Sequence, residues 1–181
     1  VKEKEIFDGV NYVINIEARG TSGPAIMFET SPNNKAVLNL YEATDKPYSY
    51  SITPEIYRLL PNGTDFMVFL ENNLTGINIS VLDGFENYHT PNDNPDNLSD
   101  KSMQHYGDQV LPIVREFVSN EKYSNPDVFK SKEDSIFFTL GNQFIRYSKN
   151  TNMVLLALIA LSILFAILNC QFKSDKLLMN H

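Results

Sequence analysis

Residues 1–120 alternate between short blocks with the two-residue period of strands and blocks with the spacing of helices. Blocks that are apolar and rich in β-branched residues predict buried strands. They are Val10–Glu17, Ala25–Glu29 and Gly76–Val81. Strands that alternate with helices along one chain are typical of a layered α/β fold.

Three short helices are expected between these strands. Asn33–Tyr41 has helical spacing of its apolar residues. Thr53 is expected to cap a helix that ends at Leu60, because Pro54 suits the first helical position. Asp65 is expected to cap a further short helix through Leu70.

A long helix is expected from Ser99 to about Val118. Its apolar positions follow an i, i+3, i+4, i+7 rhythm, which predicts one buried face. They are Met103, Val110, Leu111, Val114 and Phe117. Pro112 is expected to kink this helix because proline removes one backbone hydrogen bond.

The segment Met153–Leu168 holds no charge, and extending it to Phe172 gives a length that crosses a bilayer. Its polar residue Ser162 is expected to bond to its own helix backbone. A buried core helix is the alternative, but the length favours a membrane span, and the lipid bilayer is therefore an expected partner.

These patterns divide the chain into a domain at 1–120, a juxtamembrane connector at 121–152, a transmembrane helix at 153–172 and a tail at 173–181. Within the connector, Ser135–Tyr147 fits two structures. One is a strand pair that turns at Gly141 and Asn142, and the other is an amphipathic segment that lies on the membrane surface.

The charge and cysteine content narrow the functional classes. The net charge is -7 and no basic cluster occurs, which argues against nucleic-acid binding. With Cys170 as the single cysteine, a metal would have to be held by histidine and carboxylate ligands. The chain begins at Val1 without a leader segment, from which we expect a fragment or a processed product.

Glu17 is a candidate functional residue because it ends a predicted strand before a loop of small residues. Ligands in α/β sheets bind outside the carboxyl ends of strands. Gly20 and Gly23 would let the loop turn tightly and approach a ligand. The alternative is that Glu17 pairs with Arg19 or caps a turn.

His89 is the second candidate, in a loop that follows the strand ending at Val81. No Lys or Arg occurs from residue 59 to 100, whereas seven carboxylates do. Such a loop would attract a cation, so His89 suits a metal ligand or a general base. The alternative is a solvated acidic loop with an incidental histidine, and His105 on the long helix is expected to be a surface or packing residue.

Short sequence motifs exclude several classes of enzyme. Phosphate-binding, nucleotide-binding, GxSxG, HExxH and CxxC motifs do not occur in the chain. Glycosylation sequons do occur, but chance explains them in a chain so rich in asparagine. They begin at Asn62, Asn73, Asn78 and Asn97.

Taken together, several segments resemble the zinc aminopeptidase family of metallopeptidases, and its membrane-bound branch, which includes vacuolar membrane proteases and the endoplasmic-reticulum metallopeptidase. In order, they are NIEARGTSGP (15–24), FETSP (28–32), TDF (64–66), GFENYHTPNDNPDNL (84–98) and SMQHYGDQVL (102–111). The resemblance implies the C-terminal part of a three-layer fold with a mixed central sheet, followed by a transmembrane helix.

The resemblance also implies a site. Relatives hold two zinc ions with five ligands, and Glu17 matches the fourth ligand and His89 the last. Tyr88 matches a residue that donates a hydrogen bond to the developing oxyanion, and Asp93 is expected to orient His89 or its loop. The implied reaction is hydrolysis of a peptide substrate by a metal-bound hydroxide.

The first three ligands and the general base of the family have no counterpart in this sequence. Two ligands do not close a zinc site, so we expect the chain alone to be inactive. The alternative function is a non-catalytic ectodomain that acts as a receptor or assembly subunit. The resemblance places the peptidase domain in an extracytoplasmic or lumenal space, and no pattern indicates an oligomeric state.

Overall fold

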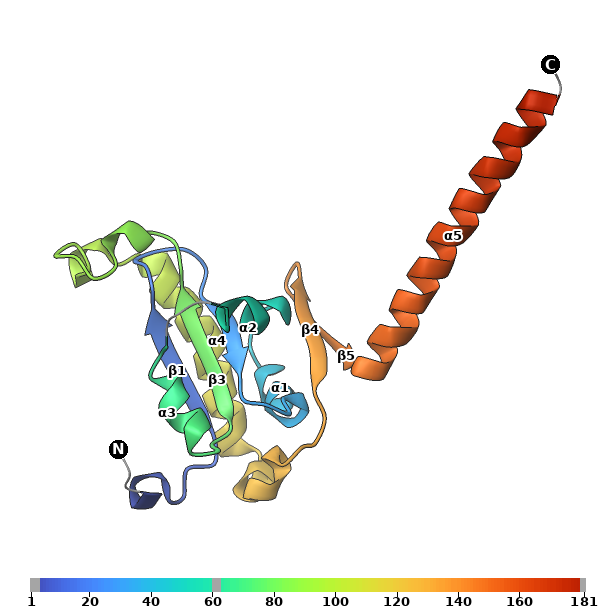
Figure 1. Cartoon of the computed structure of the whole chain (residues 1–181). Helices are drawn as coiled ribbons and strands as arrows, with labels where there is room; N and C mark the ends of the chain where they lie inside the picture. Colours follow the sequence, from blue (N-terminus) through green and yellow to red (C-terminus); the bar gives the residue numbers. More distant parts are fainter. Residues whose placement is uncertain (1–3, 60–62, 180–181) are drawn as a thin grey trace. The chain divides into compact units, whose positions relative to one another are not determined.

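The computed structural model describes residues 4–59 and 63–179 (Figure 1). Leu60 and Asn62 therefore lie outside the described residues, and so does the end of the tail from residue 180. The chain divides into two units between Arg146 and Tyr147.

The first unit is built on a mixed sheet of three strands. In chain order they are β1 (Val13–Ala18), β2 (Ile26–Thr30) and β3 (Gly76–Val81). The order across the sheet is β1-β3-β2, in which β3 runs parallel to β1 and antiparallel to β2. This mixed α/β arrangement confirms the expected fold class.

The three strands differ in how far their side chains are buried. All six residues of β3 and all five of β2 are buried, whereas Ile16 in β1 is 57% exposed. The prediction that β1 is a buried strand was wrong. β2 is also an edge strand of the described sheet, but both of its faces are covered, by the main core at Met27 and by Tyr57 at Ile26 and Phe28. The first residue of β1 is Val13, so Val10 to Tyr12 precede the strand.

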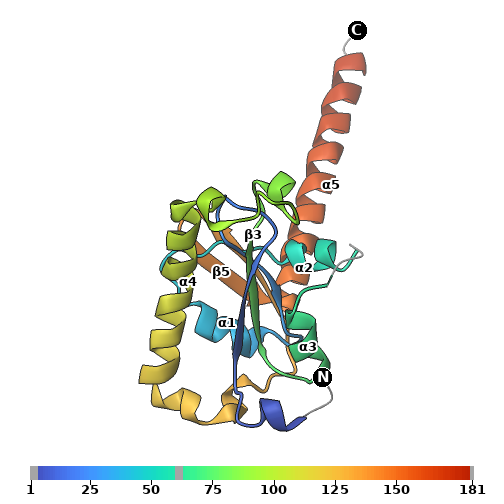
Figure 2. The ribbon, with the colours of Figure 1, turned by 90° about the vertical axis from the view of Figure 1, so that its left-hand side faces the viewer.

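Helices lie on both sides of this sheet, as Figure 2 shows with α4 (Asp100–Ser119) on one side and α3 (Phe66–Glu71) on the other. The main core joins α1 (Lys35–Tyr41) and α4 to β2 and β3 through apolar side chains. The short 3-10 helices are Lys4–Phe7, Phe85–Asn87, Pro95–Asn97, Glu121–Ser124 and Pro126–Phe129.

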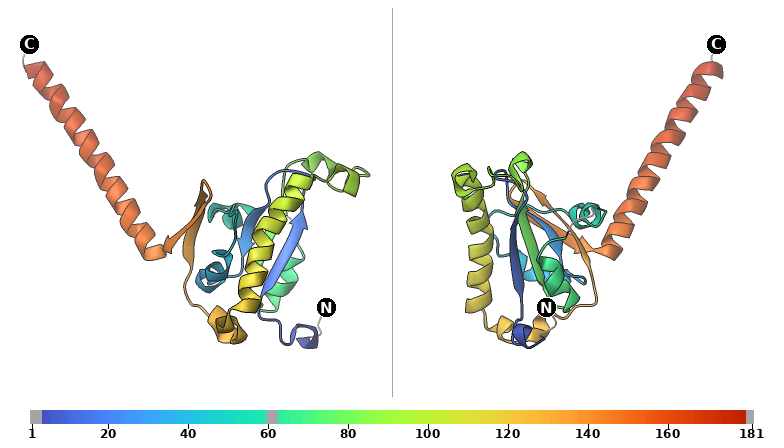
Figure 3. Two further views of the ribbon diagram at one scale, coloured as in Figure 1. Left: turned by 180° about the vertical axis from the view of Figure 1, so that it is seen from behind. Right: turned by 60° about the vertical axis from the view of Figure 1, so that its left-hand side comes forward.

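α4 begins after Ser99, whose side chain accepts a hydrogen bond from the Ser102 N–H, and it includes Pro112. Figure 3 shows the helix as one continuous ribbon. Its buried face differs from the predicted one. Tyr106 and Ile113 are buried, with Val110 and Phe117 packed beside them. The predicted core positions Met103, Leu111 and Val114 are instead 41–51% exposed.

Two predicted helix caps differ from the structure. α2 (Ile52–Tyr57) has Ser51 as its N-cap, so Thr53 lies inside the helix. The Thr53 hydroxyl donates to the backbone oxygens of Tyr50 and Phe28, which binds α2 to β2. Asp65 does precede α3, but its side chain makes no capping hydrogen bond.

Residues 121–146 contribute to the core of the first unit. Tyr123, Phe129 and Phe137 are at most 6% exposed. β4 (Ser135–Leu140) pairs with β5 (Gln143–Ser148) across a turn where Gly141 has a φ of 60°. Of the two structures expected for this segment, the strand pair is the one that forms.

The second unit is dominated by one helix, α5 (Lys149–Met179). Its segment Lys149–Gln171 is long and apolar enough to cross a membrane, and at about 1.5 Å per residue its 23 residues extend for roughly 34 Å. The Ser162 hydroxyl donates to the backbone oxygen of Leu158 at 2.8 Å, as expected for a serine within such a helix.

Candidate functional site

Two loops meet where the parallel strands β1 and β3 end. The first loop follows Glu17 and the second, residues 82–98, contains His89. Backbone bonds join them, since the Ser22 N–H donates to the Asp83 oxygen at 3.0 Å and the Asp83 N–H donates back at 3.1 Å. The Thr21 oxygen also accepts from the Ser99 N–H at 2.9 Å. The loops therefore form one hydrogen-bonded surface at the carboxyl edge of the sheet.

Glycines permit this close approach. A Cβ at Gly20 would lie 2.2 Å from the Asp83 backbone oxygen, and one at Gly23 would lie 2.6 Å from its carboxylate. Gly23 also has a φ of +92°, which side-chain-bearing residues rarely adopt. In this structure the partner that both glycines approach is the neighbouring loop.

Glu17 is the last but one residue of β1 and lies opposite Ser80 of β3. Its side chain is half-buried, and within residues 4–59 and 63–179 its carboxylate has no hydrogen-bond or ion-pair partner. Its backbone oxygen accepts a hydrogen bond from the Tyr106 hydroxyl, which in turn accepts from the Val81 N–H at 2.7 Å. The backbone at the strand ends is thus fixed, and the carboxylate is free to bind a ligand.

Arg19 does not pair with Glu17, which was the alternative structural role for that carboxylate. Its guanidinium donates to the Tyr57 hydroxyl and to the Gly63 oxygen, both at 3.3 Å, and lies 5.4 Å from the Tyr57 ring centre. Its buried Nε has no partner among the described residues. Burial raises the pKa of Tyr57, and the Arg19 charge opposes that shift.

Arg19 lines an apolar cavity of about 280 Å³ between β2 and α2. The other lining residues are Ile26, Phe28, Thr53, Ile56, Tyr57 and Leu82. Arg19 and Leu82 each follow the end of a parallel strand, so the cavity opens beside the two loops. A cavity of this kind suits an apolar side chain, with one cation at its rim.

His89 is exposed on the second loop and has a φ of 58°. Histidine adopts this left-handed conformation more readily than most side-chain-bearing residues. The His89 ring stacks on the Tyr88 ring with centroids 3.8 Å apart. The backbone N–H of His89 donates to the Asp93 carboxylate at 3.4 Å. The loop therefore presents the imidazole to solvent, with Tyr88 directly beside it.

A buried polar ladder crosses the sheet below Glu17, and no sequence pattern indicated it. The Asn78 amide oxygen accepts from Asn15 at 2.8 Å, and its nitrogen donates to Glu29 at 3.1 Å and to Thr64 at 2.9 Å. Burial raises the pKa of Glu29. The ladder stabilises the strand pairing that sets the position of Glu17.

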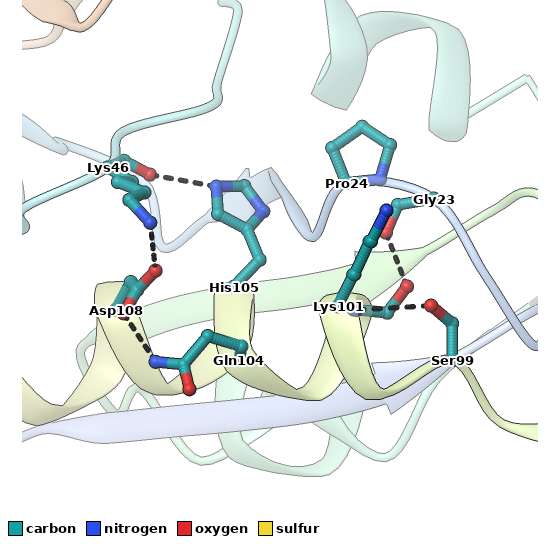
Figure 4. Close-up of a pocket in the computed structure, with 9 residues that line it drawn as sticks. Gly23, Pro24, Lys46, Ser99, Lys101, Gln104, His105 and Asp108 are labelled. Atoms are coloured by element: carbon teal, nitrogen blue, oxygen red, sulfur yellow. Dashed lines mark hydrogen bonds and ion pairs between the residues drawn. The ribbon is translucent and has the colours of Figure 1, made fainter.

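A second cavity, of about 530 Å³, lies along the first turns of α4, and His105 lines it (Figure 4). The Nδ1 atom accepts from the Ala25 N–H at 2.9 Å, so the ring proton is on Nε2, which faces the Lys46 oxygen at 3.1 Å. Burial lowers the pKa of His105. His105 thus has a packing role, connecting α4 to two loops.

The candidate ligands fit zinc by type but not by number. Carboxylate and imidazole are both zinc donors, and a structural or catalytic site needs at least three protein ligands. The part of the chain that the structure describes contains no group of three His, Cys, Asp or Glu side chains that could hold a metal ion. Glu17 and His89 would therefore supply part of a ligand set.

The sequence of this chain is similar to a peptidase family and to several curated membrane metallopeptidases and proteases. The profile of Peptidase family M28 matches residues 2–114. The putative endoplasmic reticulum metallopeptidase 1 of Schizosaccharomyces pombe is 29% identical over 162 residues, which is 88% of this chain and 19% of that protein. The vacuolar membrane protease of Candida tropicalis is 29% identical over 158 residues, covering 84% and 17%.

A mammalian relative is matched over a similar share of this chain. The endoplasmic reticulum metallopeptidase 1 of Mus musculus is 23% identical over 154 residues, covering 83% of this chain and 17% of that protein. The chain thus spans less than a fifth of the length of these curated relatives. No solved structure matches it.

Proposed function

Because the chain belongs to Peptidase family M28, we propose that it forms part of a membrane-anchored zinc metallopeptidase of the aminopeptidase type. The family match over residues 2–114 carries this proposal. The names of the relatives support it, since they describe metallopeptidases and a membrane protease. In this proposal the peptidase substrate is a peptide with a free N-terminus.

Glu17 and His89 are proposed as two ligands of a dinuclear zinc site. The support is that Glu17 lies near the end of β1, that His89 follows the parallel strand β3, and that the two loops are hydrogen-bonded to each other. Neither side chain makes a hydrogen bond or an ion pair with another described residue. Bound zinc supplies Lewis-acid chemistry, by which water becomes nucleophilic at neutral pH. The remaining ligands would come from the rest of a longer protein, so the chain alone would be inactive.

The neighbours of His89 have proposed roles in positioning and in binding. The Tyr88 phenol is a hydrogen-bond donor, stacked on His89, that would stabilise the oxyanion which develops at the substrate carbonyl. The Asp93 carboxylate accepts from the His89 N–H and would hold the strained loop in place. Arg19, which bonds to Tyr57, would bind substrate at the rim of the apolar cavity.

The cavity beside Arg19 is proposed to receive the side chain of the N-terminal residue of the peptide. Its lining by Ile26, Phe28 and Ile56 favours apolar side chains. α5 would anchor the peptidase unit, with residues 153–172 in the bilayer and the unit on the lumenal side.

Zinc content and peptidase activity of the complete membrane protein test the proposal. We expect Glu17→Gln and His89→Ala each to lower activity by at least about 100-fold and to reduce bound zinc, because each removes one metal donor. Glu86→Gln, an exposed carboxylate on the loop of His89, is the matched control and should leave both unchanged. Full zinc content and activity in both ligand variants would refute the assignment.

A non-catalytic ectodomain that acts as a receptor or assembly subunit is the second candidate. A complete protein that binds no zinc and cleaves no N-terminal residue would establish it. For the isolated chain with added zinc, turnover that is lost on His89→Ala would contradict the expected inactivity.

A further inference from the structure

The four glycosylation sequons of this chain have different structural settings. An N-linked glycan is attached through the asparagine Nδ2 atom and replaces one of its two hydrogens. The side chain must therefore be accessible, and it must not need both hydrogens for bonds within the fold. Asn62 lies outside the described residues, which leaves Asn73, Asn78 and Asn97 to compare.

Asn78 does not meet these conditions. It is fully buried in β3, and its Nδ2 donates one hydrogen to Glu29 and one to Thr64. A glycan would remove one of these bonds and would have no space between the sheet and α3. The sequon at Asn78 is thus incompatible with the fold.

Asn97 is exposed, but its side chain is part of the loop that carries His89. Its Nδ2 donates to the Asn92 backbone oxygen at 2.9 Å, and its N–H donates to the Asn94 side chain at 3.3 Å. These bonds hold the second loop in its conformation. A glycan at Asn97 would stand beside the proposed active site.

Asn73 meets both conditions. It is exposed in the turn between α3 and β3, and its side chain makes no hydrogen bond with any described residue. The turn is held by the backbone, because the Asn73 N–H donates to Leu70 and the Leu74 N–H donates to Phe69, both at 3.0 Å. Asn73 has a φ of 59°, which asparagine tolerates well.

The turn also lies away from the proposed active site. It precedes β3, whereas His89 follows β3, and the six residues of the strand separate the two by roughly 20 Å. Figure 2 shows α3 and the start of β3 at one end of the sheet and the loops at the other. A glycan on this turn would leave substrate access open.

We propose that Asn73 carries an N-linked glycan. The inference rests on the proposed lumenal placement of the peptidase unit, because the transfer takes place in that compartment. The donor is a lipid-linked pyrophosphoryl oligosaccharide. A C–N bond forms between the first sugar and Nδ2, the C–O bond to pyrophosphate breaks with its electron pair, and the amide proton passes to a base of the transferase.

Peptide N-glycosidase treatment of the complete protein from eukaryotic membranes tests the proposal. The enzyme converts a glycosylated asparagine to aspartate, which peptide mass spectrometry would detect at position 73. Asn73→Asp and Thr75→Ala should each abolish one step of the mobility shift. Ser80→Ala, which destroys the buried sequon at Asn78, should leave the shift unchanged.

If Asn73→Asp and Thr75→Ala both keep every step of the shift, or if a step is lost in Ser80→Ala or Asn97→Asp but in neither of them, the proposal is overturned. A new sequon made by Lys130→Asn with Lys132→Thr, on an exposed loop, distinguishes a failure at Asn73 from a failure of the lumenal placement. If it gains a glycan while Asn73 has none, the inference on Asn73 fails and lumenal placement stands. If neither is modified, lumenal placement fails and the inference with it.

Discussion

Replacing Ile56 by tryptophan would test whether the apolar cavity between β2 and α2 binds the substrate side chain. Ile56 is 53% exposed on α2 and lines the cavity of about 280 Å³ beside Arg19. A larger ring at this position can rotate into the cavity without entering the packed core. The substitution should therefore change which N-terminal residues are accepted and leave the fold intact.

The size of the effect follows from the area that the cavity removes from water. A leucine side chain has three more carbons than alanine, and burial of each stabilises binding by about 0.8 kcal/mol. A total of about 2.4 kcal/mol corresponds to roughly a 50-fold preference for leucine in kcat/KM. A filled cavity would remove most of this preference, so the leucine-to-alanine ratio should fall at least tenfold.

The assay compares leucyl and alanyl peptide substrates with the complete membrane protein. Ile52→Trp is a matched control, because Ile52 lies one turn earlier on α2, is 61% exposed, and does not line the cavity. The control should keep the original ratio. Equal ratios in the native protein, Ile56→Trp and Ile52→Trp would show that substrate binds elsewhere.

Two further predictions concern stability, measured by thermal unfolding of the purified membrane protein. Asn78→Leu should cost about 3–5 kcal/mol, because it removes three hydrogen bonds and leaves the Glu29 carboxylate buried without its donor; an unchanged melting temperature would contradict the ladder. The pKa of His105 is lower in the folded protein than its ordinary 6.5, so the unfolded chain takes up the proton at a higher pH. Stability should therefore fall as the pH drops below about 6.5, because a protonated Nδ1 no longer accepts from the Ala25 N–H. His105→Gln should remove that part of the pH dependence, and an identical pH profile in this variant would disprove the role of the ring.

Elements with a local signal could be predicted from the sequence. The bounds of β3 follow from an apolar, β-branched run that starts at Gly76, and α4 starts after Ser99 because its hydroxyl caps the first turn. For residues 135–147 the sequence left a hairpin and an amphipathic segment open, and the hairpin forms with its turn at Gly141, which has a positive φ. In each case the decisive contacts lie within a few residues of the signal.

Burial could not be predicted where it depends on neighbours distant in the sequence. Ile16 belongs to an apolar run but is exposed, whereas Ile26 and Phe28 of β2, also an edge strand of the described sheet, are buried against Tyr57 of α2. On α4, two overlapping apolar stripes occur, and contact with β2 and β3 selects Tyr106 and Ile113 rather than Met103 and Leu111. Periodicity alone does not choose between such stripes.

The residues that surround the candidate site could not be predicted from the sequence for the same reason. Glu17 stands out because it ends a strand-like run, and His89 stands out because its loop follows such a run. Tyr57, which bonds to Arg19, and Glu29, which bonds to Asn78, carry no local signal, and they approach the site only through strand pairing. A sequence pattern therefore indicated candidate ligands, and the fold was needed to show what surrounds them.

The strand order β1-β3-β2 also has a consequence for synthesis on the ribosome. β1 and β2 are made first, but neither pairs with the other, and both must wait for β3 about 50 residues later. At about 5–20 residues per second this delay lasts roughly 3–10 seconds. During this interval β1 and β2 lack the strand that lies between them in the described sheet, so the pairings β1-β3 and β3-β2 both form only after β3 emerges.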